Sequence, residues 1–143
     1  MSITQAIATS FKQECFLAIH DFDTTTGDTF KMALYNSSAD LGSTTTAYTA
    51  TNEVSGTGYS AGGATLTGVQ PTTSGTVAFI DFADLTFSTV TLTGVRGALI
   101  YNSSKANRAV AVLDFGRDID KTAADLVVTF PEASSNSAIL RFT

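Results

Sequence analysis

The clearest pattern in the chain lies between Thr76 and Phe115, where four apolar runs follow one another with only short turn signals between them. The runs are rich in β-branched and aromatic residues, and each is about as long as one β-strand. Serial short strands are typical of a sheet built by pairing neighbours in sequence. We therefore predict an all-β fold, a β-sandwich of jelly-roll or Ig-like type with about eight strands and one short N-terminal helix.

Two of these runs, Thr76–Phe82 and Arg108–Phe115, have no clean polar face. One face of a strand in a small sandwich normally meets water, so such strands need a second cover. We expect that cover to come from a helix or from another subunit. In a third run, Leu85–Thr93, the apolar alternation slips by one position at Ser88–Thr89. Because strand side chains alternate with period two, we predict a β-bulge there.

The N-terminal part of the chain predicts one helix and one strand. Ser10 and Gln13 fit a capping box at the start of a helix over Phe11–Ile19. The apolar stripe of that helix consists of Phe11, Cys15, Phe16 and Ile19. Met1–Thr9, ahead of it, is interpreted as either a short helix or an N-terminal arm. Thr29–Asn36 alternates apolar and polar residues and predicts a half-buried strand.

The stretch Ser37–Gly75 is dense in Ser, Thr and Gly, and we interpret it as a long loop region anchored by a few apolar residues. A further connection is predicted at Gly116–Ala124, before two final strands at Leu126–Phe130 and Ala138–Thr143. Within the loop region we expect a helical or turn piece at Thr46–Val54, a glycine loop at Gly56–Gly63, a strand near Ala64–Val69 and a turn at 70–75.

Length and charge limit the class of protein. We predict that 143 residues form a single domain, 1–143, large enough for a real core. The net charge is −5 and the eight Lys and Arg are scattered, which argues against a surface that tracks nucleic-acid phosphates. Neither a signal peptide nor a membrane-spanning run is recognised, so we expect synthesis in the cytoplasm. The single cysteine, Cys15, excludes an intrachain disulfide and is expected to be a buried, inert thiol.

The only histidine and the aspartates that follow it are the first candidates for catalytic or metal-binding residues. No nucleophile motif accompanies His20, so we expect it to sit at the C-terminal end of the helix, where positive charge is favourable. Asp21, Asp23 and Asp28 surround Gly27, but their spacing departs from that of an EF-hand loop. A solvated turn is favoured there, and an irregular calcium site stays open.

Two other groups of residues are candidates for a functional site. Asp81, Asp84 and Asp114 are candidates for the paired carboxylates of a hydrolase, although turn aspartates are ordinary at strand ends. Gly56–Gly63 is not followed by Lys-Ser/Thr, which argues against a phosphate cradle. We therefore predict no catalytic, cofactor-binding or metal-binding residues, no cofactor, and a protein that is not an enzyme.

One resemblance points to a function. Asp28–Tyr35 (DTFKMALY), Tyr48, Asn52–Tyr59 (NEVSGTGY) and the pair Gly62 and Gly63 together resemble small structural proteins of tailed-bacteriophage virions. The resemblance extends over most of the chain. It implies a capsid decoration or cement protein that binds and stabilises the head shell, with a tail or neck component as the alternative. No catalytic residue is implied.

The same resemblance implies partners and a location. The partners would be copies of the chain itself, with a trimer favoured, and a major capsid protein or other virion protein. Direct contact with nucleic acid or a membrane is not implied, and the protein would be located in the virion. A competing class is a carbohydrate-binding β-sandwich, in which Tyr48 and Tyr59 would stack against sugars. A small hydrolase is the third class.

Overall fold

The computed structural model describes residues 2–143 and shows two antiparallel β-sheets packed as a sandwich, with one short helix. The five-stranded sheet has the order β1-β7-β6-β2-β3, and the three-stranded sheet has the order β4-β5-β8. The elements are β1 Ala6–Ile7, α1 Thr9–Phe16, β2 Phe30–Asn36, β3 Ala64–Thr65, β4 Gly68–Ser74, β5 Val77–Phe82, β6 Leu85–Asn102, β7 Arg108–Val128 and β8 Leu140–Phe142. The predicted all-β sandwich is confirmed, and Met1 lies outside the described residues.

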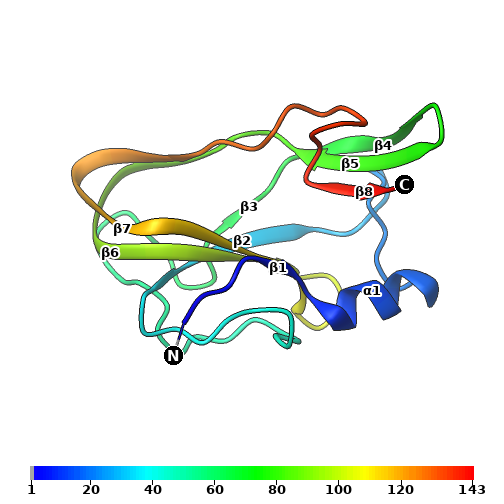
Figure 1. Cartoon of the computed structure of the whole chain (residues 1–143). Helices are drawn as coiled ribbons and strands as arrows, with labels where there is room; N and C mark the ends of the chain where they lie inside the picture. The colour runs from blue at the N-terminus through cyan, green and yellow to red at the C-terminus, as the bar shows by residue number, and fades with distance from the viewer. Residues whose placement is uncertain (1) are drawn as a thin grey trace.

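The long hairpin of β6 and β7 links the two layers. Figure 1 shows the paired strands running beside β2 and then curving over, at the left of the view, toward the layer of β4, β5 and β8. The register breaks along the way: from the Val95–Ile119 pair to the Gly97–Asp114 pair, β6 advances two positions and β7 five. Extra residues in one strand bend a two-stranded ribbon, so these irregularities allow one hairpin to serve both layers.

The bulge predicted at Ser88–Thr89 is confirmed. The register of β6 against β7 shifts between Phe87 and Val90, and Thr89 adopts the left-handed region at φ 49°. With this extra residue, Phe87, Val90 and Leu92 are all buried. The bulge therefore corrects the phase of the apolar alternation, as the sequence pattern requires.

The apolar part of β7, Ala109–Val112, is buried throughout, and its second cover comes from the same chain. β1 pairs with β7, α1 packs against it, and the Ala109 N–H donates to the Thr46 carbonyl. Ile3 is also buried. Residues 2–9 thus pack into the fold as a short strand with its flanking residues. The sequence had allowed either a short helix or an N-terminal arm for this segment.

The predicted helix over Phe11–Ile19, with Ser10 as its N-cap, is wrong at both ends. α1 begins at Thr9, after an N-cap at Ala8 that makes no side-chain hydrogen bond. The Thr9 N–H donates to the Ser43 carbonyl at 2.8 Å. A distant backbone acceptor therefore satisfies a helix N-terminus that was expected to use a side chain.

The buried stripe of this helix also differs from the prediction. Phe11 and Glu14 face the fold, Cys15 is half-buried, and Phe16 is 89% exposed. The helix ends at Phe16, and Ala18 follows in the left-handed region at φ 55°. The helix is too short to bury the longer stripe that apolar spacing suggested.

The strand predicted at Thr29–Asn36 is confirmed as β2, but it is buried on both faces along Met32–Tyr35, so its predicted half-burial is wrong. The loop region covers it. The Leu34 N–H donates to Tyr59 Oη at 2.9 Å, which fixes the segment 47–63 against this strand.

Two segments predicted as connections belong to strands. The 70–75 stretch is largely part of β4. Pro71 lies at a register break on this edge strand, so its missing N–H costs no ladder hydrogen bond. The 116–124 stretch lies within β7 and pairs irregularly with β6. Thr46–Val54, predicted as a helical or turn piece, forms turns and isolated bridges.

Candidate interaction cleft

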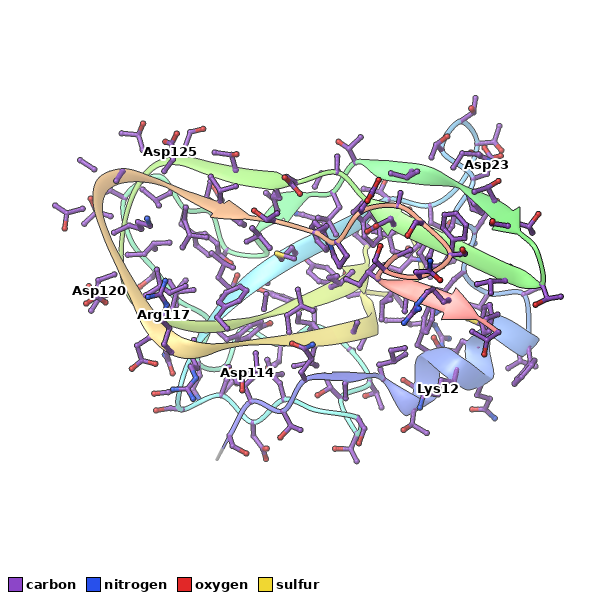
Figure 2. All side chains as sticks on the ribbon, turned by 45° about the horizontal axis from the view of Figure 1, so that its top comes forward. Lys12, Asp23, Asp114, Arg117, Asp120 and Asp125 are labelled. Atoms are coloured by element: carbon purple, nitrogen blue, oxygen red, sulfur yellow. The ribbon has the colours of Figure 1, made fainter. Side chains whose placement is uncertain are left out.

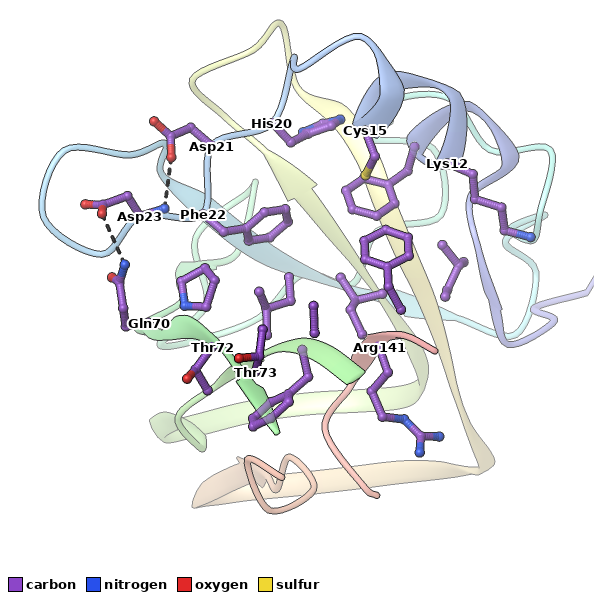
Figure 3. Close-up of a pocket in the computed structure, with 18 of the residues that line it drawn as sticks. Lys12, Cys15, His20, Asp21, Phe22, Asp23, Gln70, Thr72, Thr73 and Arg141 are labelled. Atoms are coloured by element: carbon purple, nitrogen blue, oxygen red, sulfur yellow. Dashed lines mark hydrogen bonds between the residues drawn. The ribbon is translucent and has the colours of Figure 1, made fainter. Parts of the chain in front are cut away.

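An open cleft of about 890 Å³ lies between α1, the loop that follows it and the three-stranded sheet (Figure 3). On the sheet side, Ile80 of β5 pairs with Leu140 of β8, and the same face carries Phe142. Directly paired residues point to the same side of a sheet, so these side chains form one apolar wall. Phe11 and Phe22 lie among the residues of the opposite wall.

The cleft exists because the sandwich core is left open at this end. Phe22 stacks on Phe30 with ring centroids 4.3 Å apart, and Phe30 lies 5.9 Å from Phe82. Beyond this aromatic cluster, Ile80 is only half-buried and Phe142 is 65% exposed. Facing layers of a sandwich normally interdigitate, so this end presents apolar surface that the chain itself does not cover.

Two further large apolar side chains are exposed next in sequence to residues that line the cleft. Phe16 and Leu17 are 89% and 62% exposed, and they stand between Cys15 and Ala18, which both line the cleft. Exposed apolar groups scattered singly are normal, but a contiguous patch marks a contact site. The cleft, with the exposed Phe142 at its border, offers apolar surface of this kind.

Charged side chains lie at opposite ends of the cleft. Figure 3 shows Asp21 and Asp23 at one end and Lys12 and Arg141 at the other. None of the four takes part in the ion pairs found among residues 2–143. Backbone N–H donors, that of Thr26 foremost, lower the pKa of Asp23 to about 2, so this carboxylate is ionised at neutral pH.

Cys15 lines the cleft and is half-buried, where a buried thiol was expected. Burial first, and the neighbouring Glu14 carboxylate second, raise the pKa of this thiol above its usual value. Little thiolate therefore forms at neutral pH, which makes Cys15 a slow nucleophile, although reagents can reach it through the cleft.

His20 does not lie at the helix end as predicted, since α1 stops at Phe16. Its fully buried ring joins a polar network below the cleft. Its Nε2 lies 2.6 Å from Glu14 Oε2, and Glu14 Oε1 accepts from Arg108 at 3.1 Å. Its Nδ1 lies 3.0 Å from Asn102 Nδ2. The network ties α1 and the following loop to the β6–β7 turn.

The three aspartates of the loop are hydrogen-bonded to the chain itself. Asp21 Oδ1 accepts from the Asp23 N–H, and Asp28 Oδ2 accepts from the Asp21 N–H and from Asn102. Asp23 accepts from two N–H groups of its own turn and from Gln70. Within residues 2–143, no group of three or more His, Cys, Asp or Glu side chains is arranged to hold a metal ion.

Asp114 lies apart from Asp81 and Asp84, the other two carboxylates considered for a hydrolase. Asp81 lies on β5 in the three-stranded sheet, and Asp84, just beyond this strand, accepts from the Phe130 N–H at 2.8 Å. Asp114 lies on β7 in the five-stranded sheet, 3.3 Å from Arg96. The three carboxylates therefore do not come together in one site.

Tyr48 and Tyr59 are engaged inside the fold. Their hydroxyls donate to Glu53 at 2.6 and 2.7 Å, and the Gly62 N–H donates to the same carboxylate at 2.7 Å. The ring of Tyr48 also stacks on Tyr101 at 5.0 Å. These two tyrosines therefore clamp the loop region and do not form an open platform for sugars. No sequence motif marks Glu53, whose role appears only when three donors converge on it.

The described part of the chain contains no helix that is both long and apolar enough to cross a membrane. Comparison of the chain with protein-family models, with curated proteins and with solved structures gave no match.

Proposed function

We propose that this chain is a non-enzymatic structural component of a bacteriophage particle, a decoration or cement protein that binds and stabilises the head shell. The family assignment rests on the resemblance carried by Asp28–Tyr35 and Asn52–Tyr59. The proposed partners are copies of the chain and a major capsid protein or other virion protein, and the proposed location is the virion.

The observation that supports this proposal is the open apolar cleft. A sandwich that leaves Ile80 half-buried and Phe142 and Leu17 exposed carries apolar surface whose burial against another protein is favourable. A protein that works by coating a shell needs contact surface of this kind. The cleft supports protein contact in general, and the resemblance selects the phage particle as its setting.

The test is made on particles produced from a genome that encodes the chain. The protein should co-purify with gradient-purified particles, and antibody labels should decorate the head. Particles made without the gene should assemble but release their DNA at a lower temperature, because a cement protein adds contacts between shell subunits. Absence of the protein from washed particles would reject the proposal.

The alternatives give different outcomes in the same experiment. Labels confined to the tail or neck would assign the chain to that part of the particle. A protein absent from particles that is retained on immobilised glycans would favour the carbohydrate-binding class. The engagement of Tyr48 and Tyr59 by Glu53 argues against that class at these two residues.

A further inference from the structure

The cleft needs an occupant with matching apolar surface. Its lining includes Ile80, which is half-buried, and its border carries Phe142, which is 65% exposed. Water in contact with these walls costs free energy in proportion to the apolar area. The exposed Phe142 of a second copy offers apolar surface that can cover these walls.

The charges around the cleft are arranged for a copy of itself. The anionic end holds Asp21 and Asp23, and the cationic end holds Lys12 and Arg141 (Figure 3). A two-fold axis through the cleft turns each end onto the opposite end of the partner. Lys12 then faces Asp21 of the second copy, and the reverse contact forms as well, so both ends gain opposite charges.

We propose that two copies of this chain pair face to face through the cleft, about a two-fold axis that sets the cationic end of each against the anionic end of the other. This pairing deepens the proposed function by giving the surface through which copies meet. It differs from a trimer, which only the phage resemblance favours, because a trimer needs a heterologous contact and a self-complementary surface closes at two.

Charge reversal tests the pairing. Lys12→Glu alone, or Asp21→Lys alone, sets like charges against each other twice in the pair and should weaken it by about tenfold. An equimolar mixture of the two variants should restore pairing, because a mixed pair contains only opposite contacts. Analytical ultracentrifugation of wild type, each variant and the mixture measures the dissociation constants. Restoration in the mixture also shows that both variants are folded.

Matched controls lie at the far end of the molecule. Figure 2 shows Arg117 and Asp120 at the opposite end from Lys12 and Asp23. Arg117→Glu and Asp120→Lys make the same charge changes there, and Asp120, like Asp21, accepts one backbone N–H. Neither control should change the dissociation constant. Phe142→Ser, which alters the exposed apolar border without changing charge, should weaken pairing and serves if a reversal variant fails to fold.

Cys15 gives an independent readout, since it is the only cysteine and lines the cleft. Its reaction with a thiol reagent should slow as the protein is concentrated, and Lys12→Glu should remove this dependence. A protein that stays monomeric up to about 1 mM, forms trimers without dimers, or shows no effect of the reversals would overturn the inference. Protection of Cys15 only after particles are added would overturn it in favour of a shell protein in the cleft. All measurements except this last one use the purified chain alone. If pairing is not found, attachment of the chain to the particle therefore remains a separate question.

Discussion

His20 Nε2 lies 2.6 Å from Glu14 Oε2, and this contact joins the loop after α1 to the helix itself. The Asn102 amide faces the other ring nitrogen and also donates to Asp28 Oδ2 at 2.8 Å. The amide nitrogen of Asn102 can only donate hydrogen bonds, so His20 Nδ1 must accept one. The ring proton then lies on Nε2, which donates a hydrogen bond to Glu14. The network therefore fixes one tautomer of His20 and holds one wall of the cleft in place.

Glu14→Ala should destabilise the fold. Glu14 is only 6% exposed, and its loss leaves the buried His20 Nε2–H and the Arg108 guanidinium without their acceptor. We expect the free energy of unfolding to fall by about 2–3 kcal/mol, measured by urea denaturation. The neighbouring exposed residue Gln13 gives the control, because Gln13→Ala should change the free energy of unfolding by less than about 0.5 kcal/mol. Equal effects of the two substitutions would show that the network contributes nothing.

The buried hydroxyl of Tyr48 should make the fold less stable at alkaline pH. Burial first, and then its bond to Glu53, raise the pKa of its hydroxyl from 10.0 to about 12. Above pH 10 the unfolded chain loses this proton while the folded chain keeps it, so the contribution is complete below pH 10 and disappears by about pH 12. Urea unfolding across this range should show a steeper fall for wild type than for Tyr48→Phe. Parallel curves would contradict the assignment.

The sequence predicted those parts of the fold that depend on local alternation. The central strands and the bulge at Ser88–Thr89 follow from apolar spacing alone, since a slipped strand would turn its core residues outward. Two strand ends are likewise set by local chemistry, since Asn36 accepts from the Ser38 N–H and Asn102 from the Ser104 N–H.

The parts that failed depend on distant partners. The start of α1 is satisfied by the Ser43 carbonyl, which no local motif announces. β4 is exposed along its whole length, so it has no apolar face to reveal it. The cleft was also missed, because Lys12 and Arg141 come from opposite ends of the chain. Its one sequence signal was the surplus of apolar residues in Thr76–Phe82, interpreted as a need for a second cover.

Gly63 should tolerate no side chain. It adopts φ 79°, and a Cβ there would lie 1.7 Å from the Met32 carbonyl oxygen, so the glycine loop would have to leave β2. Gly63→Ala should cost about 3 kcal/mol or more of unfolding free energy. Gly94 has a similar φ of 68° but no atom within 4 Å, so Gly94→Ala should cost only about 1–2 kcal/mol. Similar losses in denaturant unfolding would show that backbone strain alone, and not close approach to β2, explains Gly63.

Asp81 should lower stability at neutral pH. It is only 1% exposed, its Oδ1 accepts from the Phe82 N–H, and its Oδ2 has no partner among the described residues. Burial raises the pKa of this carboxyl above its usual 3.8; the Phe82 and Ile139 N–H groups oppose this rise, and nearby Asp84 adds to it. The folded chain therefore holds a proton at pH values where the unfolded chain has released it, and stability falls as pH rises from 3.8 through the folded pKa.

Asp81→Asn tests this by removing the charge while keeping an acceptor for the Phe82 N–H. The variant should be more stable than wild type at neutral pH, and its advantage should shrink as pH is lowered to 3.8 and below, where the unfolded wild-type chain also takes up the proton. Melting temperatures of the two proteins across that range give the measurement. Asp125→Asn, at an exposed carboxylate that accepts the Thr89 N–H, is the control and should show no advantage at neutral pH. If Asp81→Asn is less stable than wild type at neutral pH, the buried carboxylate is stabilising and has a partner that offsets its burial.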